Sequence, residues 1–129
     1  MADFNDKLNE MNNTKDYTAE YDKNDIEQNK VMAILAYLGW LVLIPLFAAK
    51  ESKYARFHVN QGLILAIVET VIMIVLSILT LIPVIRWIFY IVEAVAGIVF
   101  LVMWIIGIMN AANGRAKELP VIGSFRLLK

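Results

Sequence analysis

Residues 50–62, with the sequence KESKYARFHVNQG, separate two long apolar runs. The preceding run, 31–49, has nineteen residues and no charged side chain, and the following run, 59–82, has a single charge, Glu69. An α-helix of about 20 apolar residues crosses the ~30 Å hydrocarbon core of a bilayer. The polar stretch therefore predicts a turn between two membrane-spanning helices.

The composition favours an integral membrane protein. Hydrophobic residues make up 60% of the 129 residues, and the mean hydropathy is +0.63, whereas soluble domains usually contain about 45–50% apolar residues. The net charge is zero, but residues 1–29 carry eight acids and three lysines, and residues 30–129 carry nine Lys/Arg and four Glu. The absence of cysteine excludes disulfides, thiol catalysis and cysteine metal sites. The sequence contains no basic patch with interleaved aromatic residues, the pattern that would indicate nucleic-acid binding.

We expect an all-α fold in which three transmembrane helices form a small bundle after a disordered, acidic N-terminal tail. Asn24 and Glu27 have the spacing of a capping box, which marks a helix start. Pro83 ends the second helix and leaves a short turn, so the second and third helices form a hairpin. The predicted segments are a tail at 1–24, a transmembrane domain at 25–114 with helices at about 25–49, 59–82 and 86–109, and a basic amphipathic tail at 115–129.

Lysine and arginine residues set the predicted orientation. Three spans place the two ends on opposite sides, and the positive-inside rule puts the first loop and the C-terminus in the cytoplasm. Alternatively, the first helix, which is short and contains Pro45, is re-entrant and leaves both ends on the cytoplasmic side. The counted cations are Lys23, Lys30 and Arg86 on one side, and Lys50, Lys53, Arg56, Arg115, Lys117, Arg126 and Lys129 on the other.

Four short motifs carry a resemblance to a known family: AYL at 36–38, LIP at 43–45, RFH at 56–58 and NQG at 60–62. Over residues 28–114 the chain resembles small bacterial membrane proteins of the domain of unknown function forty-eight seventy. That family is similar in turn to the Tic-twenty component of the chloroplast import machinery. The resemblance implies a small helical bundle in a bacterial cytoplasmic membrane and, through the plant protein, a part in a protein-conducting channel.

Two acids, Glu69 and Glu93, fall within the predicted membrane spans. Because a charge in hydrocarbon is costly, an ionisable residue there is a candidate functional group. With Tyr90 and Ser77, which the hairpin turns toward the same space, they form the candidate intramembrane polar site. Three roles are open: neutral or hydrogen-bonded glue between helices, a proton or cation path with Glu69 as relay, or a site for a partner's basic transmembrane residue.

A second candidate site, the interfacial motif, lies at the start of the second helix. Its histidine is either a pH sensor or, as we favour, a polar anchor at the membrane interface. The neighbouring cations either bind anionic lipid headgroups or are ordinary flanking charges, which we favour. Gly107 and Ala111 have the spacing of a close helix contact. The motif consists of Arg56, Phe57, His58, Gln61 and Gly62.

The sequence does not predict an enzyme. It has one histidine, no Ser-His-Asp set, no HExxH motif and no glycine-rich phosphate loop, and we expect no cofactor or metal. The predicted function is non-catalytic binding of membrane proteins or lipids in a multi-pass protein. The alternatives are an oligomeric channel or translocation component, which would need self-association or a partner, and an immunity or regulatory protein. The expected partners are the lipid bilayer and other membrane proteins or further copies, without nucleic acid.

Overall fold

The computed structural model describes residues 4–128, except for the side chain of Asn5. Over this range the fold is helical and has no strand, only one isolated antiparallel bridge between Asp16 and Lys117. The all-α class is therefore confirmed. The elements are α1 (Phe4–Met11), η1 (Thr18–Glu20), α2 (Lys23–Gln28), α3 (Lys30–Leu35), η2 (Gly39–Val42), α4 (Leu43–Ala48), α5 (Lys53–Leu79) and α6 (Arg86–Ala112).

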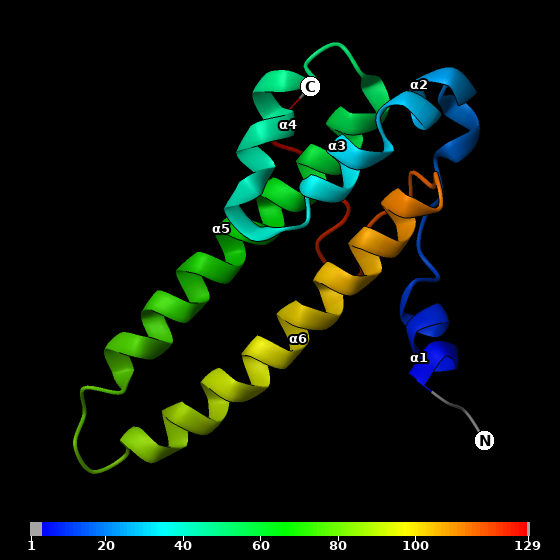
Figure 1. Ribbon diagram of the computed structural model, residues 1–129. Helices are drawn as coiled ribbons and strands as arrows, with labels where there is room; N and C mark the ends of the chain where they lie inside the picture. The colour runs from blue at the N-terminus through cyan, green and yellow to red at the C-terminus, as the bar shows by residue number, and fades with distance from the viewer. Residues whose placement is uncertain (1–3, 129) are drawn as a thin grey trace.

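Two long antiparallel helices, α5 and α6, form a hairpin that runs the length of the molecule (Figure 1). Each has 27 residues, or about 40 Å at 1.5 Å per residue, and both are long and apolar enough to cross a membrane. α5 begins at Lys53, six residues before the predicted start, because the Ser52 side chain accepts a hydrogen bond from the Ala55 N–H at 3.0 Å. The polar stretch therefore belongs largely to the helix rather than to a loop.

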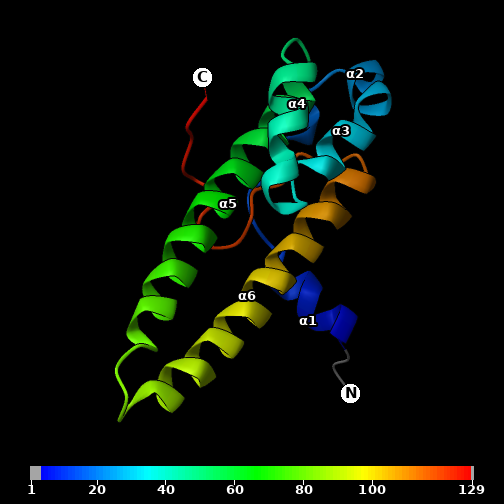
Figure 2. The ribbon, with the colours of Figure 1, turned by 60° about the vertical axis from the view of Figure 1, so that its left-hand side comes forward.

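The predicted first spanning helix at 25–49 is wrong, because this segment is broken into α2, α3, η2 and α4. Gly39 has φ +63°, a left-handed conformation that interrupts a helix. The end of this segment then lies next to its beginning. The Asp25 carboxylate accepts hydrogen bonds from the Ser52 hydroxyl at 2.6 Å and the Tyr54 N–H at 3.0 Å. Within residues 4–128 two helices rather than three are long and apolar enough to span a membrane, and the first apolar run folds back on itself, as in the re-entrant alternative (Figure 2).

Two glycines let this re-entrant segment enter between the long helices. A Cβ atom on Gly62 of α5 would lie 1.8 Å from the Ala36 carbonyl oxygen. One on Gly107 of α6 would lie 2.2 Å from the ring of Tyr37. Both distances are far below van der Waals contact, so only glycine fits at either position. The sequence predicted a close helix contact at Gly107 and Ala111; the residue that lies against Gly107 is Tyr37, in the turn after α3.

The buried core lies at one end of the hairpin. The buried residues of α5 fall within 54–66 and those of α6 within 100–111. We call residues 4–66 and 100–128 the base, and residues 67–99 the distal hairpin. Large apolar side chains of the distal hairpin are exposed, among them Ile67, Val71, Ile74, Ile78, Leu81, Val84, Trp87, Ile91, Val95 and Ile98. Such a surface is foreign to a soluble monomer and typical of a surface that faces lipid or a partner.

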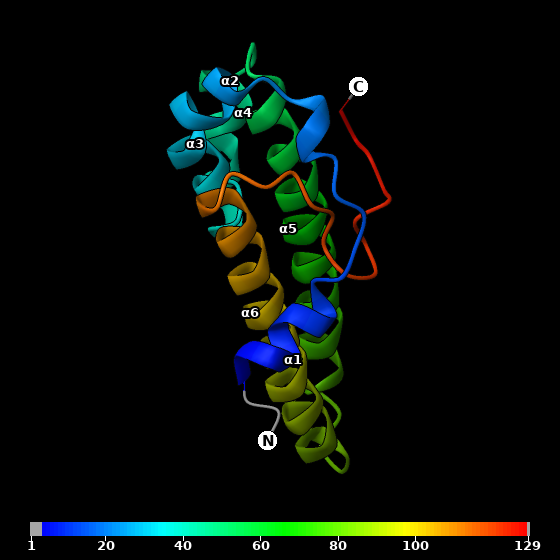
Figure 3. The ribbon, with the colours of Figure 1, turned by 90° about the vertical axis from the view of Figure 1, so that its right-hand side faces the viewer.

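The N- and C-terminal segments lie side by side along the base (Figure 3). The Tyr17 N–H donates to the Ala116 carbonyl at 2.8 Å, and the Glu118 N–H donates to the Lys15 carbonyl at 3.0 Å. The prediction that the two ends lie on opposite sides of the membrane is therefore wrong.

Residues 4–22, expected from composition to be disordered, contain α1 and η1 in the structure. Leu8 of α1 is buried in the core. Residues 1–3 of the predicted tail lie outside the described residues.

Candidate functional site

The interfacial motif at 56–62 points largely into the protein. His58 and Gln61 are 0% and 1% exposed, and Phe57 and Gly62 are also buried. Only Arg56 keeps a partly exposed side chain. The structure therefore differs from the expectation of a histidine anchored at the headgroups. Phe57, His58 and Gln61 contact the C-terminal segment instead, and Gly62 lies against Ala36.

His58 joins three parts of the base. Its Nε2 lies 2.8 Å from the Arg115 carbonyl oxygen, and because a carbonyl only accepts, Nε2 carries the proton. Nδ1 of the neutral ring then accepts from the Tyr37 hydroxyl at 2.6 Å. Tyr54 adds a parallel link, because its hydroxyl donates to the Ala111 carbonyl at 2.9 Å. The ring thereby connects the re-entrant segment, α5 and the segment after α6.

Two amide side chains of α5 bind the backbone of the last ten described residues. Gln61 Nε2 donates to the Gly123 carbonyl at 2.9 Å, and Gln61 Oε1 accepts from the Leu119 N–H at 2.8 Å. Asn60 Oδ1 accepts from the N–H groups of Leu127 and Leu128 at 3.2 and 2.6 Å. We call His58, Asn60 and Gln61 the tail clamp. Asn60 was not among the predicted site residues, although it stands in the same motif.

Charges and rings complete the contact between the two terminal segments. The Arg126 guanidinium lies 6.0 Å from the ring centroid of Tyr17 in the N-terminal segment and 5.3 Å from that of Phe57 in α5, and it pairs with Glu118 of its own segment at 3.1 Å. Arg115 pairs with Asp16 at 3.6 Å. Partial burial acts to raise the pKa of Asp16, but hydrogen bonds from Thr18 and the positive charges of Arg115 and Lys117 outweigh it, so this pKa lies below its usual value.

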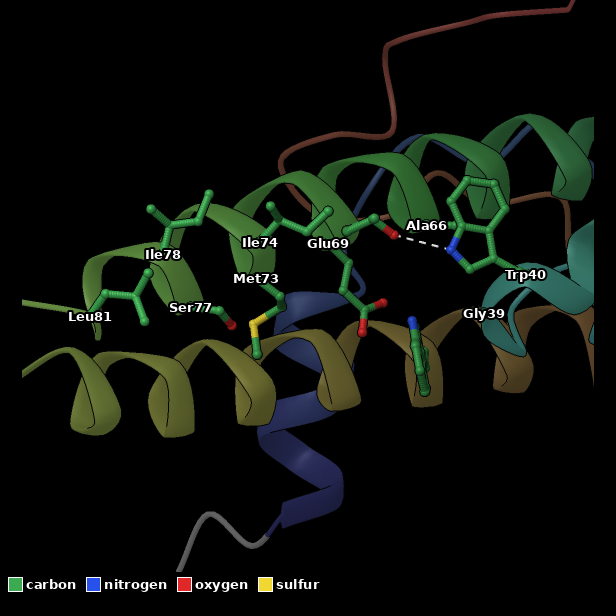
Figure 4. A pocket seen from close by; sticks show the side chains of 11 residues that line it. Gly39, Trp40, Ala66, Glu69, Met73, Ile74, Ser77, Ile78 and Leu81 are labelled. Carbon is green, nitrogen blue, oxygen red and sulfur yellow. Dashed lines mark hydrogen bonds between the residues drawn. The ribbon is translucent and has the colours of Figure 1, made fainter. Parts of the chain in front are cut away.

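A groove of about 540 Å³ opens between α5, α6 and the re-entrant turn (Figure 4). The Glu69 side chain points into it from α5, and Trp104 of α6 also lines it. Across the mouth, Trp40 Nε1 donates to the Thr70 hydroxyl at 3.1 Å. Sequence reasoning found Glu69 but missed Trp40, Thr70 and Trp104, because their approach depends on the re-entrant turn.

The other predicted intramembrane residues are partly brought together. The Ser77 hydroxyl of α5 donates to Glu93 Oε1 of α6 at 2.7 Å. Ser77 also lines the groove, two helical turns beyond Glu69. Tyr90 is 52% exposed on α6. The arrangement supplies polar links between the two long helices. Among residues 4–128, no three His, Asp or Glu side chains are grouped so that they could hold a metal ion.

A model of the magnetosome magnetite crystal formation protein family matches residues 28–128. The chain belongs to this family. The matched range includes the re-entrant segment, both long helices and the C-terminal segment held by the tail clamp. Membership of a magnetosome family, together with the two apolar helices, places the protein at a membrane.

A curated relative within this magnetosome family is the magnetosome protein MamF of Paramagnetospirillum magneticum (strain ATCC 700264 / AMB-1). The two sequences are 46% identical over 35 residues, which is 27% of this chain and 32% of the relative. The match thus spans about a third of the relative's length. No solved structure matches the chain.

The family match corrects the resemblance drawn from residues 28–114. The assignment to the family of unknown function forty-eight seventy, and through it to the Tic-twenty proteins, is wrong, because the matching model is that of the magnetosome crystal formation family. The quoted motifs were too short to separate families of small helical membrane proteins. The protein-conducting role implied by the plant proteins loses its support with the assignment.

Proposed function

We propose that this chain is an integral protein of the magnetosome membrane that contributes to magnetite crystal formation by binding lipids and membrane proteins, without catalysis. The observation that carries the proposal is the distal hairpin, residues 67–99, whose large apolar side chains are exposed. In a bilayer the hydrocarbon chains cover such a surface, and each helix satisfies its own backbone groups. The match to the crystal formation family supports the magnetosome as the compartment.

The length of the hairpin fits two membrane crossings, one by α5 and the return by α6. About 20 residues span the hydrocarbon, so a span that ends at Ile82 begins near Leu63, where the buried core of the base ends. Arg86 and Trp87 then lie at the far interface, where arginine and tryptophan are favoured. Exposed apolar side chains at the turn of the re-entrant segment enter the near leaflet; they include Leu38, Trp40 and Leu41.

Charge supports a cytoplasmic base. Among the described residues, Arg86 is the one lysine or arginine at the far end of the hairpin, and the other cations belong to the base. The positive-inside rule therefore places the base, with both terminal segments, in the cytoplasm. The tip at 80–85 contains no carboxylate, the ligand preferred by hard metal ions. We therefore assign the contribution to crystal formation to contacts in the membrane and at the base rather than to acidic groups at the tip.

Single-cysteine labelling tests this arrangement, because the native chain has no cysteine. Glu10→Cys, Lys117→Cys and Val84→Cys are expressed in a magnetite-forming bacterium, and intact isolated magnetosomes receive a membrane-impermeant maleimide. We expect labelling at residues 10 and 117, and protection of residue 84 until detergent is added. Labelling of 10 and 117 from opposite sides, or of all three positions before detergent, would contradict the proposed topology.

We further propose that Glu69 and Glu93 act as hydrogen-bonded links between α5 and α6. The observations that support this role are the hydrogen bond from Ser77 to Glu93 and the position of Trp104 beside Glu69 in the groove. Hydrogen bonds between membrane helices contribute about 0.6 kcal/mol on average and up to about 1.7 kcal/mol. Hydrogen bonds of this strength hold the two helices together, and this role requires no transport of protons or cations.

Two substitutions at Glu69 separate this structural role from a relay. Glu69→Gln keeps the polar group and removes ionisation. Its free energy of unfolding in mixed micelles should therefore equal that of the native chain. Magnetite crystals should also reach the same size with either chain in a bacterium that lacks its own family member. Glu69→Leu removes the Trp104 contact and should lower the free energy of unfolding by about 1 kcal/mol. If Glu69→Gln alone abolished the effect on crystals while stability stayed unchanged, Glu69 would be a relay or a counter-ion for a partner.

A further inference from the structure

We infer that a second face of α5, away from the groove of Figure 4, binds one anionic phospholipid. The inference rests on the proposed membrane crossing and adds the ligand and its site. Two adjoining hollows form this face, which we name the headgroup hollow and the acyl groove. The headgroup hollow, of about 810 Å³, is lined by Glu20, Tyr21, Lys53, Arg56, Phe57, Asn60, Arg126, Leu127 and Leu128. The acyl groove, of about 330 Å³, is lined by Ile64, Ile67, Val68, Ile122, Phe125, Arg126 and Leu127.

A single stripe of α5 connects the two hollows. Its members at 53, 56, 57, 60, 64, 67 and 68 recur every three or four residues and therefore share one helix face. The stripe changes character along the helix, from charged and polar at Lys53, Arg56 and Asn60 to aliphatic at 64–68. From Lys53 to Ile67 it covers about 21 Å at 1.5 Å per residue. This is the polarity order of a phospholipid, from its headgroup to its acyl chains.

The headgroup hollow has the charge that a phosphate diester requires. Its lining contains three cations and one acid, Glu20, and Glu118 pairs with Arg126 from outside the lining, which leaves a net positive charge of one. Arg126 stands at the junction of the hollows and is held there by Glu118 at 3.1 Å and by the Phe57 ring at 5.3 Å. Lys53 and Arg56 supply the remaining positive charge. Nη1 of Arg126 already donates to the carbonyls of Gly123 and Phe125, and Nη2 donates to Glu118, so Arg126 contributes mainly its charge to this position.

The acyl groove favours a lipid over an acidic peptide. An acidic segment of a partner would match the charge of the headgroup hollow but would leave the aliphatic half uncovered. Phe125 and Leu127 are 61% and 54% exposed beside Ile67. The groove also begins near Leu63, where the proposed hydrocarbon boundary falls. A lipid whose phosphate lies between the cations thus has its chains at membrane depth.

Lipid retention by the purified full-length chain tests the inference. Native mass spectrometry would compare phosphatidylglycerol with phosphatidylcholine of the same acyl chains. We expect the native chain to retain phosphatidylglycerol preferentially. In Lys53→Gln/Arg56→Gln its affinity should fall roughly five-fold for each cation removed. Lys50→Gln is the matched control, because Lys50 lies in the adjacent loop over Phe47 and lines neither hollow.

A second variant and a competitor address the acyl groove. Val68→Phe narrows the groove without changing charge and should also weaken phosphatidylglycerol retention. Water-soluble glycerophosphoglycerol, added to the native chain, should displace the lipid poorly. Equal retention of both lipids, an unaffected double variant, or displacement by the soluble headgroup as efficient as by whole lipid would each overturn the inference.

Membrane insertion is followed separately by resistance to carbonate extraction. The double variant should remain in the carbonate-resistant fraction with a native helical signal, so a lost preference for phosphatidylglycerol would concern only the lipid site. If the native chain itself were extracted by carbonate, the proposed membrane crossing would fail instead. The two failures are thus distinguishable.

Discussion

Replacing Gly62 with alanine should unfold the base. The added Cβ would lie 1.8 Å from the carbonyl oxygen and 2.6 Å from the carbonyl carbon of Ala36. Both atoms belong to the backbone of the re-entrant segment, so no side-chain rotation relieves the overlap. Overpacking by one methylene in a well-packed core typically costs 1–3 kcal/mol, and we expect a loss of at least about 3 kcal/mol here. Denaturant titration in mixed micelles, followed by circular dichroism, measures it.

Gly97 provides the matched control for this substitution. It also lies in a long helix, but a Cβ there meets nothing within 4 Å. Gly97→Ala should therefore leave stability unchanged or raise it by up to about 1 kcal/mol through helix propensity. Gly107→Ala meets the side chain of Tyr37 rather than backbone, so shortening Tyr37 should partly rescue it but not Gly62→Ala. If Gly62→Ala behaved like Gly97→Ala, the re-entrant segment would not lie against α5.

Hydropathy predicted the two long helices but could not give the course of the first apolar run. Nineteen uncharged residues are as compatible with a short span as with a segment that turns back, because hydropathy measures length and polarity and not direction. The local signals were Gly39 and Pro45, which favour a break. The decisive contacts, Ala36 with Gly62 and Tyr37 with Gly107, join residues far apart in the sequence. No periodicity reveals such contacts.

The contacts at the candidate sites were likewise only partly predictable from the sequence. The short turn was predicted to bring Ser77, Tyr90 and the two acids into one space; in the structure Ser77 forms a hydrogen bond with Glu93, and Tyr90 is 52% exposed. The C-terminal partners of His58 and Gln61 lie 57 to 62 residues away, in the segment predicted to be a basic amphipathic tail. In a sequence, polar side chains at a helix start are equally compatible with anchoring at lipid headgroups and with binding another segment of the chain. Only the folded chain shows that they bind backbone.

Gln61→Leu should release the C-terminal segment while leaving the long helices in place. The substitution keeps a similar volume but removes the acceptor for the Leu119 N–H and the donor to the Gly123 carbonyl. Both groups belong to buried residues. A buried polar group without a partner costs about 1–3 kcal/mol. The Leu119 N–H loses its acceptor, whereas the Gly123 carbonyl keeps the hydrogen bond from Arg126 Nη1, so the docked state is disfavoured by about 1–3 kcal/mol. Residues 119–128 should therefore detach, since water can satisfy their backbone groups.

Hydrogen exchange and limited proteolysis measure this release. In Gln61→Leu, residues 119–128 should exchange and be cleaved much faster than in the native chain, while the distal hairpin keeps its protection. Asn113→Ala is the control, because Asn113 is exposed just beyond α6. Release should also move Arg126 and Leu127 away from α5 and lower the retention of phosphatidylglycerol, although Lys53 and Arg56 are intact. Unchanged protection of residues 119–128 would mean that Gln61 does not hold this segment, and that the motif at 56–62 has another role.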